Sequence, residues 1–232
     1  MKKILIVCEE SQRVCISFRE RGFEAYSCDL LDCSGGHPEW HIKGNCLSFV
    51  NGNCSFYTVD GTRHIISGVW DLVVGHPPCT YFSNATAVNL GRKDNPDVFN
   101  EEWRNRFFAN RDLMYDLFLH IYNCNAKYVA VENVIGYLNT HFRKPDQIVQ
   151  PFYFGEPYRK ATCLWLRNLP LLNPTEIVVP TCKWVRHTLK ERNDLDGYLY
   201  KGRYTAKERS TTFWGIARAM AVQWGNFLEN NV

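Results

Sequence analysis

Apolar and polar positions in the first part of the chain follow the order of a β-α-β unit. Residues 2–8, KKILIVC, form an apolar run typical of a buried strand, and residues 23–28 form a second run that ends in Asp29. Between them, residues 11–22 are predicted as a helix, with apolar positions at Val14, Ile16 and Phe18, arginines in the last turn and Gly22 as a stop signal. This order predicts an α/β fold with an open, mostly parallel sheet and helices on both faces.

The same alternation continues to the end of the chain. We expect a short third strand within residues 41–46 and a hairpin around Asp60-Gly61, which is a turn signal. The long helix predicted at 101–122 has an apolar stripe expected to face the core: Phe107, Phe108, Leu113, Leu117, Phe118 and Ile121. Further elements are predicted as strands at 127–131, 150–154 and 162–166, a short helix at 135–142, and a last helix at 210–229 capped by Ser210.

The stretch from Trp70 to Asn84, WDLVVGHPPCTYFSN, carries the first candidate for chemistry. It begins as a strand, and the sequence Gly-His-Pro-Pro then ends it, because prolines cannot donate to a sheet ladder. Cys79 therefore lies on a stiff loop beyond the carboxyl end of a strand, where open α/β sheets bind ligands. A thiol there can act as a nucleophile, and the alternative is a buried cysteine that only packs.

Two acidic residues follow strands in the same way. Asp29 at the end of the second strand suits the ribose hydroxyls of an adenosine cofactor, although a solvated turn residue would look the same. Glu132 and Asn133 follow the strand predicted at 127–131, so a carboxylate and an amide are also expected beyond a strand end.

Composition restricts the class of protein. The chain has 232 residues, 45% hydrophobic and 22% charged, which is ordinary for a globular protein with one sizeable core. Its net charge of +3 permits a polyanionic partner without requiring one. No stretch approaches the ~20 apolar residues that span a bilayer, and the N-terminus does not resemble a signal peptide. The ten cysteines are therefore expected to be reduced in a cytoplasmic protein.

A structural zinc site is the alternative use of these cysteines. Six Cys and His residues crowd one segment, namely Cys28, Cys33, His37, His41, Cys46 and Cys54. However, no pair of Cys-x-x-Cys motifs is present, and Cys28 falls within a predicted strand. We therefore expect no metal.

Three segments together resemble one enzyme family. Residues 77–83, PPCTYFS, resemble the Pro-Pro-Cys-Gln-x-Phe-Ser nucleophile loop of DNA cytosine-5 methyltransferases. Residues 132–134 match the family's Glu-Asn-Val motif, and residues 223–226, QWGN, are similar to its C-terminal Gln-x-Gly-Asn motif. The resemblance implies a Rossmann-like methyltransferase fold that uses S-adenosyl-L-methionine, with residues 1–232 as one catalytic domain.

The resemblance also implies roles for individual residues. Cys79 would attack C6 of cytosine, and Glu132 would contact N3 as the general acid. The target base must leave its stack for this attack, which implies base flipping in a duplex. A third family element, Gly-x-Pro-Gln-x-Arg-x-Arg, corresponds to residues 155–162, GEPYRKAT, where Lys160 and Thr162 replace the two arginines and Arg159 is a possible substitute.

The cofactor site implied by the resemblance has an unusual first loop. The family's glycine-rich turn is replaced by residues 8–12, CEESQ, which contain no glycine and would limit how closely the backbone approaches the cofactor. Asn45 could replace an adenine contact. The residues assigned to S-adenosyl-L-methionine are Glu9, Ser11, Asp29, Leu30, Asn45, Cys46, His76, Pro77 and Asn226.

The expected partner is DNA, read by a short segment at about 167–209. This segment interleaves Lys and Arg with Trp and Tyr, a mixture suited to phosphate contacts and base stacking, and the alternative is a solvated basic face with the loop at 85–98 holding the nucleic acid. Because the segment is short, RNA or a free pyrimidine nucleotide is an alternative substrate. Because the glycines of the cofactor loop are missing, a non-catalytic nucleic-acid-binding module is an alternative function. The compact build is similar to small family members from phages and mobile elements, and a monomer is expected.

Overall fold

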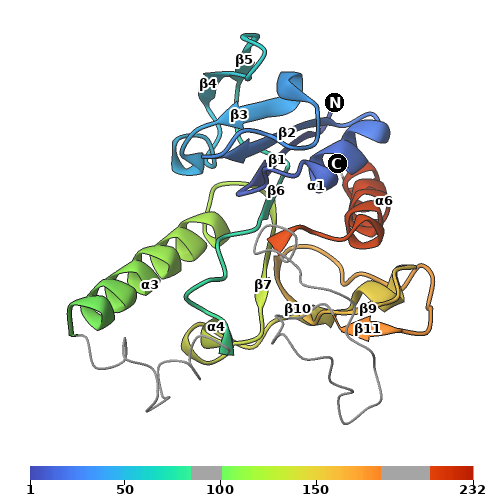
Figure 1. The fold of residues 1–232 in the computed structure, drawn as a ribbon. Coiled ribbons are helices and arrows are strands. Elements are labelled where there is room, and N and C mark those ends of the chain that lie inside the picture. The colour runs from blue at the N-terminus through green and yellow to red at the C-terminus, as the bar shows by residue number, and fades with distance from the viewer. Residues whose placement is uncertain (85–100, 184–209, 232) are drawn as a thin grey trace.

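A seven-stranded sheet forms the centre of the computed structural model, which describes residues 1–84, 101–183 and 210–231 (Figure 1). The strand order is β3-β2-β1-β6-β7-β10-β8. The strands are β1 (Lys3–Val7), β2 (Glu24–Asp29), β3 (His41–Lys43), β6 (Leu72–Gly75), β7 (Tyr128–Val134), β8 (Gln147–Val149) and β10 (Thr162–Arg167). The strand β10 runs antiparallel to both of its neighbours, and the other pairs are parallel. The predicted open, mostly parallel sheet is therefore confirmed.

Helices cover both faces of this sheet. The helices α1 (Arg13–Glu20) and α6 (Trp214–Asn230) lie on one face, and α3 (Glu101–Tyr122) with α4 (Tyr137–His141) lies on the other (Figure 1). Alternate side chains of each strand enter two separate apolar clusters, because successive strand residues point to opposite faces. In β1, for example, Ile4 and Ile6 pack against α1 and α6, whereas Leu5 and Val7 face α3. This Rossmann-like, doubly wound arrangement places the carboxyl ends of β1, β2, β6 and β7 at one edge.

Smaller elements surround the sheet. The antiparallel hairpin β4 (Cys54–Tyr57) and β5 (Arg63–Ile66) confirms the turn predicted at Asp60-Gly61, and β3 confirms the short third strand. A second small pair joins β9 (Tyr158–Arg159) to β11 (Cys182–Lys183) in parallel. Short 3-10 helices within the described residues are η1 (Pro38–Trp40), η2 (Cys46–Ser48) and η4 (Pro151–Tyr153).

Three local predictions were wrong. The strand expected at 150–154 lies earlier, at β8, because Pro151 cannot donate to a ladder and begins η4 instead. Ser210 does not cap the last helix, which begins at Trp214, where the Glu156 carboxylate accepts a hydrogen bond of 2.8 Å from the Gly215 amide. In α3, Phe107, Phe118 and Ile121 are buried, but Leu113 is 60% exposed and does not join the core stripe.

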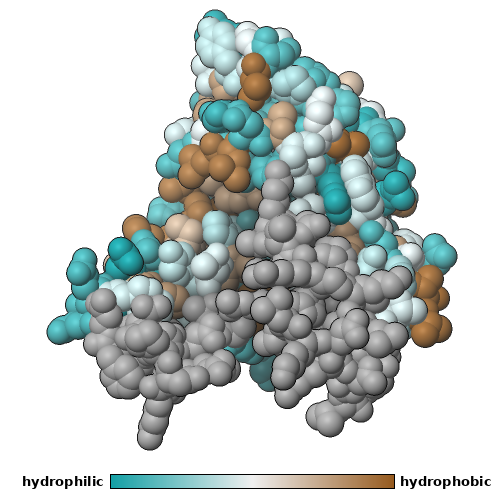
Figure 2. Space-filling model, viewed as in Figure 1, coloured by the Kyte–Doolittle hydropathy of each residue, from teal (hydrophilic) through white to brown (hydrophobic). Residues whose placement is uncertain are grey.

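The described surface carries apolar side chains in small groups. Figure 2 shows brown apolar residues among hydrophilic ones on the face viewed. Exposed apolar residues include Leu30 after β2 and Tyr57 and Ile65 on the hairpin. No described helix is long and apolar enough to cross a membrane.

Trp224 provides a test of how the last helix is attached. Its side chain is fully buried where α6 packs against α1 and the sheet. Its indole Nε1 donates a hydrogen bond of 3.0 Å to the Pro170 carbonyl. We predict that Trp224→Ala lowers the free energy of unfolding by about 3–5 kcal/mol, because it leaves a large cavity. Urea denaturation followed by circular dichroism would measure this. Val222→Ala, at a 41% exposed position of the same helix, is the control and should change stability by less than about 1 kcal/mol.

Candidate active site

His76 and Glu132 form the best-defined polar contact at the carboxyl edge of the sheet. The register of β6 and β7 pairs Val74 with Ala130, so the next residues on the same face, His76 and Glu132, lie side by side. His76 Nδ1 lies 3.1 Å from Glu132 Oε2. Their side chains are only 7% and 14% exposed, which makes this a buried pair rather than a surface contact.

Glu132 lies within a strand, which corrects the sequence-based placement. The prediction ended the strand at Val131, but β7 continues to Val134 because β10 pairs with it there, Leu164 opposite Glu132 and Thr162 opposite Val134. The neighbouring strand β6 has already ended at Gly75. The carboxylate therefore projects from a rigid strand beside the first residues of the Cys79 loop.

The Cys79 loop is attached at two points, to Asn133 in β7 and to Tyr137 at the start of α4. Asn133 Nδ2 donates a hydrogen bond of 2.8 Å to the Pro77 carbonyl, and the Tyr137 amide donates one of 2.8 Å to the Phe82 carbonyl. Gly136 is required at this contact, since a Cβ there would lie 1.9 Å from the Phe82 carbonyl oxygen. Cys79 is half-buried between these two attachments, and its carbonyl accepts a hydrogen bond from the Phe82 amide. The predicted placement of Cys79 on a loop beyond the carboxyl end of a strand is confirmed.

The charges around Glu132 favour its ionised form. Burial raises its pKa, but the hydrogen bond from His76, the positive charge of Lys160 and the charge of His76 outweigh burial and lower the pKa overall. Glu132 thus behaves as a carboxylate that accepts a hydrogen bond from His76.

The segment from Gly155 to Thr162 brings Lys160 toward this site. Glu156 anchors the segment by capping α6. Lys160 Nζ lies 5.6 Å from the centre of the Phe213 ring, directly before α6. Thr162 is buried in β10 and its hydroxyl donates a long 3.4 Å hydrogen bond to the Lys160 carbonyl, while Arg159 is half-buried in β9. Of the residues predicted here, Lys160 is the one whose charge acts on Glu132.

The loop after β1 adopts a glycine-like backbone without glycine. Cys8 and Gln12 both have positive φ values, 59° and 60°, a region that costs non-glycine residues about 1–3 kcal/mol. The Gln12 side chain makes two hydrogen bonds to the main chain of His37. Its Nε2 donates to the His37 carbonyl at 2.8 Å, and its Oε1 accepts from the His37 amide at 3.1 Å. Ser11 is half-buried, and its carbonyl faces Gly35. The loop therefore follows a tight path that the sequence did not lead us to expect.

Glu9 closes the amino end of α1. Its buried carboxylate accepts hydrogen bonds of 2.7 Å from the Val14 amide and 3.2 Å from the Cys15 amide. Burial raises the pKa of Glu9 to about 7, although the charge of His76 and the two amides act in the opposite direction. Glu9 and His76 are thus electrostatic neighbours within the same buried cluster.

The ends of β2 and β3 carry the residues assigned to an adenosine group. Asp29 is half-buried, and its Oδ1 accepts a hydrogen bond of 3.0 Å from the Leu31 amide. Leu30 beside it is 72% exposed. Asn45 is exposed, but its Oδ1 already caps η2 by accepting the Leu47 amide at 3.1 Å, and Cys46 is buried next to Cys8. The Asn45 carbonyl oxygen is thus already used in a local turn.

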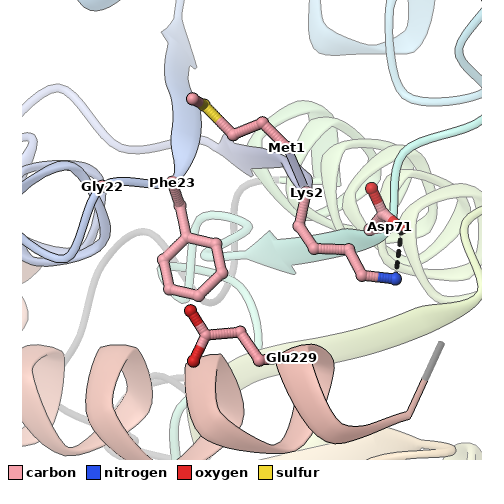
Figure 3. A pocket seen from close by; sticks show the side chains of 6 residues that line it. All are labelled: Met1, Lys2, Gly22, Phe23, Asp71 and Glu229. Atoms are coloured by element: carbon pink, nitrogen blue, oxygen red, sulfur yellow. Dashed lines mark ion pairs between the residues drawn. The ribbon is translucent and has the colours of Figure 1, made fainter.

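The structure does not bring Asn226 to this edge. Its Oδ1 accepts a hydrogen bond of 2.7 Å from Arg21, at the end of α1 that lies by the amino ends of the strands. A cavity of about 490 Å³ lies at this opposite edge, where Lys2 and Asp71 form an ion pair of 3.3 Å (Figure 3). Its lining residues are Met1, Lys2, Gly22, Phe23, Asp71 and Glu229. Sequence reasoning placed Asn226 by resemblance alone, and this placement is wrong for the structure.

Two structural partners were missed by the sequence analysis. Glu156 looked like part of a catalytic motif, and its capping of α6 became visible only in three dimensions. His76 was assigned to the cofactor, whereas its ring contacts Glu132. A signal existed for this second contact, because both residues follow neighbouring strands at the same register.

Other predictions concern residues outside the described part of the chain. The loop at 85–98 lies there, as does most of the segment at 167–209, including all of its residues beyond Lys183. Among the residues described, no group of three or more His, Cys, Asp and Glu side chains is placed to hold a metal ion.

Comparisons with known proteins give distant similarities. No family model matches the chain, and no curated protein matches it. A solved structure of a DNMT2 mutant from Spodoptera frugiperda aligns at 17% identity and a TM-score of 0.41, covering 77% of this chain and 55% of that one. The Dnmt2 methyltransferase of S. pombe aligns at 14% identity and 0.40, covering 71% and 48%. The chain therefore spans about half the length of these two proteins.

The Glu9 carboxyl predicts a specific dependence of stability on pH. Its pKa is about 7 in the folded protein and about 4.5 in an unfolded chain, so the folded state binds the proton more tightly. The stabilisation of the folded state by the protonated Glu9 carboxyl is complete below pH 4.5 and is lost as the pH rises through 7. Relative to Glu9→Gln, the parent should lose on the order of 3 kcal/mol of unfolding free energy between pH 4.5 and pH 8.

Urea denaturation at a series of pH values measures this difference. Glu20→Gln, at an exposed position at the end of α1, controls for the loss of one carboxylate and should keep the parent's pH dependence. Parallel stability curves for the parent and Glu9→Gln would contradict the prediction.

Proposed function

We propose that this protein is an S-adenosyl-L-methionine-dependent DNA cytosine-5 methyltransferase. The observation that carries the proposal is the attachment of the Cys79 loop to the strand that bears Glu132. Asn133 in β7 bonds to Pro77, and Tyr137 at the start of α4 bonds to Phe82, so the loop that carries Cys79 is fastened on both sides to the segment that follows Glu132. A nucleophile and an acid fixed in this way suit attack on a flat heteroaromatic ring.

The residues of the site have separate tasks in this reaction. The Cys79 thiolate bonds to C6 of cytosine, which moves electron density to C5 and creates a need for a proton at N3. Glu132 supplies the contact at N3, and Lys160 adds positive charge near that carboxylate. Because C6 is covered in a stacked duplex, the base must be flipped out or already unpaired.

The edge of the sheet fits an adenosine cofactor without phosphates. Asp29 stands at the end of β2, where a carboxylate suits ribose hydroxyls, and the exposed Leu30 offers an apolar surface to adenine. In dinucleotide-binding folds the helix after the first strand receives a pyrophosphate, but here Glu9 already occupies the amides of Val14 and Cys15. A carboxylate in that position would repel a phosphate. S-adenosyl-L-methionine, when bound, supplies a methyl group on a sulfonium, and it carries no phosphate.

A comparison of substrates tests the proposed reaction. We predict methyl incorporation from radiolabelled S-adenosyl-L-methionine into duplex DNA, with the label recovered as 5-methylcytosine. Single-stranded DNA, transfer RNA and dCMP are tested in parallel. If label appears only in transfer RNA or only in dCMP, that molecule is the substrate and the proposal of DNA is wrong. Absence of any cofactor binding by calorimetry would favour the non-catalytic module.

Cys79 is predicted to be the covalent nucleophile. With DNA that carries 5-fluorocytosine at target sites, the parent should form an adduct stable in a denaturing gel, because fluorine cannot leave C5 as a proton does. Cys79→Ala should form none. Cys54→Ala, at another half-buried cysteine in β4, is the matched control and should form the adduct normally. An adduct with Cys79→Ala would remove this residue from the mechanism.

A further inference from the structure

Arg13 is a cation at the carboxyl edge of the sheet whose charge is not taken up by an acidic side chain. It is the first residue of α1, directly after the loop that leaves β1. Its Nη1 donates a hydrogen bond of 2.9 Å to the Thr212 carbonyl, and its Cζ lies 5.3 Å from the centre of the Trp214 ring. Among the residues that the structure describes, no acidic side chain forms an ion pair with Arg13. Its positive charge is therefore available to a ligand.

The two contacts of Arg13 hold its guanidinium where two helices begin. Thr212 and Trp214 lie at the start of α6, so this half-buried side chain joins the amino ends of α1 and α6. The hydrogen bond to Thr212 uses Nη1, and within the described part of the chain Nε and Nη2 make no hydrogen bond. A planar guanidinium held on one side can donate from its other edge to both oxygens of a carboxylate.

The helix amides at this edge are not free to bind a ligand anion. Glu9 accepts hydrogen bonds from amides in the first turn of α1, and Glu156 accepts one from the first turn of α6. The positive charge of Lys160 acts on Glu132 and lowers its pKa. A ligand carboxylate at this edge must therefore be met by another side-chain cation, and Arg13 is placed for this role.

The proposed cofactor brings such a carboxylate to the end of β1. S-adenosyl-L-methionine has adenosine at one end and a methionine group with a free carboxylate at the other. Asp29 at the end of β2 suits the ribose, and Cys79 follows β6, where the methyl group is needed. Because β1 lies between β2 and β6, the methionine group then lies over the end of β1. The loop that leaves β1 leads directly to Arg13.

We propose, on the basis of the proposed use of S-adenosyl-L-methionine, that Arg13 binds the carboxylate of its methionine group. Nε and Nη2 donate to the two carboxylate oxygens, while Thr212 and Trp214 keep the guanidinium in place. Arg13 in this role favours a cofactor with a free carboxylate over one without it. It is a binding residue and takes no part in the bond changes at the base.

Removing the carboxylate from the ligand and removing the guanidinium from the protein should have the same effect. Calorimetry measures how tightly the parent and Arg13→Gln bind S-adenosyl-L-methionine and its decarboxylated form, which lacks only that group. We expect the parent to bind S-adenosyl-L-methionine about 10- to 100-fold more tightly, as is typical of hydrogen bonds between charged groups. Arg13→Gln should bind the two ligands with nearly equal affinity, close to that of the parent for the decarboxylated form.

Arg218 provides a matched control on the same aromatic ring. Its Cζ lies 5.6 Å from the centre of the Trp214 ring, but its side chain is exposed, and Arg218→Gln should keep the parent's preference. Arg13→Lys keeps the charge without the two parallel donors and should recover part of the preference. Circular dichroism checks that each variant folds. The parent alone also tests the proposal, because equal affinity for the two ligands would overturn it.

The remaining outcomes separate this inference from the proposed function. If Arg13→Gln keeps the full preference, or loses affinity equally for both ligands, Arg13 does not bind the carboxylate and the proposed function stands. If the variant weakens binding to duplex DNA and leaves cofactor affinity unchanged, the guanidinium contacts nucleic-acid phosphates and the inference is wrong. A parent that binds neither ligand contradicts both proposals. A preference that depends on Arg13 in a protein that methylates no substrate supports the inference and contradicts the proposed reaction.

Discussion

The antiparallel pairing of β10 with β7 is the constraint on which the candidate site depends. It holds β7 in strand geometry as far as Val134, although β6 on the other side has ended at Gly75. The last residues of β7 therefore have β10 on one side and the Cys79 loop on the other. Asn133 uses this position to bond to Pro77, and Gly136 lets the loop pass close by. Without β10, the part of β7 beyond Val131, which carries Glu132, would have no strand partner.

The buried charges at this edge form one system rather than separate pairs. Glu9 and Glu132 are both buried carboxyl groups on either side of His76, yet their pKa values move in opposite directions. Glu9 is dominated by burial, and its helix amides only partly compensate. Glu132 has a direct hydrogen bond from His76 and the charge of Lys160. The two carboxyl groups therefore differ in how tightly they hold a proton, although both lie near His76.

Much of the fold could be predicted because local pattern and tertiary packing agree. The bounds predicted for α3 match those observed, and the first two strands and their helix follow from apolar periodicity. The errors occur where a distant partner decides the local structure. Glu132 is in a strand because β10 pairs with it, and α6 begins at Trp214 with a cap from Glu156. Neither partner lies within reach of a local sequence window.

In the candidate site, too, the features set by local sequence were predicted and those set by distant partners were not. The Cys79 loop follows from two prolines after a strand, which is local chemistry. The His76 contact needs the register between β6 and β7, which the two separate segments do not display. The backbone of the loop after β1 was not predicted from the sequence. Cys8 and Gln12 adopt positive φ without being glycine, and both the amide nitrogen and the amide oxygen of the Gln12 side chain are hydrogen-bonded to the main chain of His37.

Two helices that begin at the site edge have their amino ends closed by carboxylates of the protein itself. Glu9 bonds to the first amides of α1, and Glu156 bonds to the Gly215 amide in the first turn of α6. A free helix amino end attracts anions through its unpaired amides and its dipole. With both ends occupied, positive charge at this edge must come from side chains, such as Lys160 beside Glu132 and Arg13, which lies 5.3 Å from the centre of the Trp214 ring. Side-chain cations can follow a ligand as it moves, whereas helix amides are fixed. For the methyl transfer proposed above, in which a base is drawn out of its stack and released again, side-chain cations suit the substrate better than fixed helix amides.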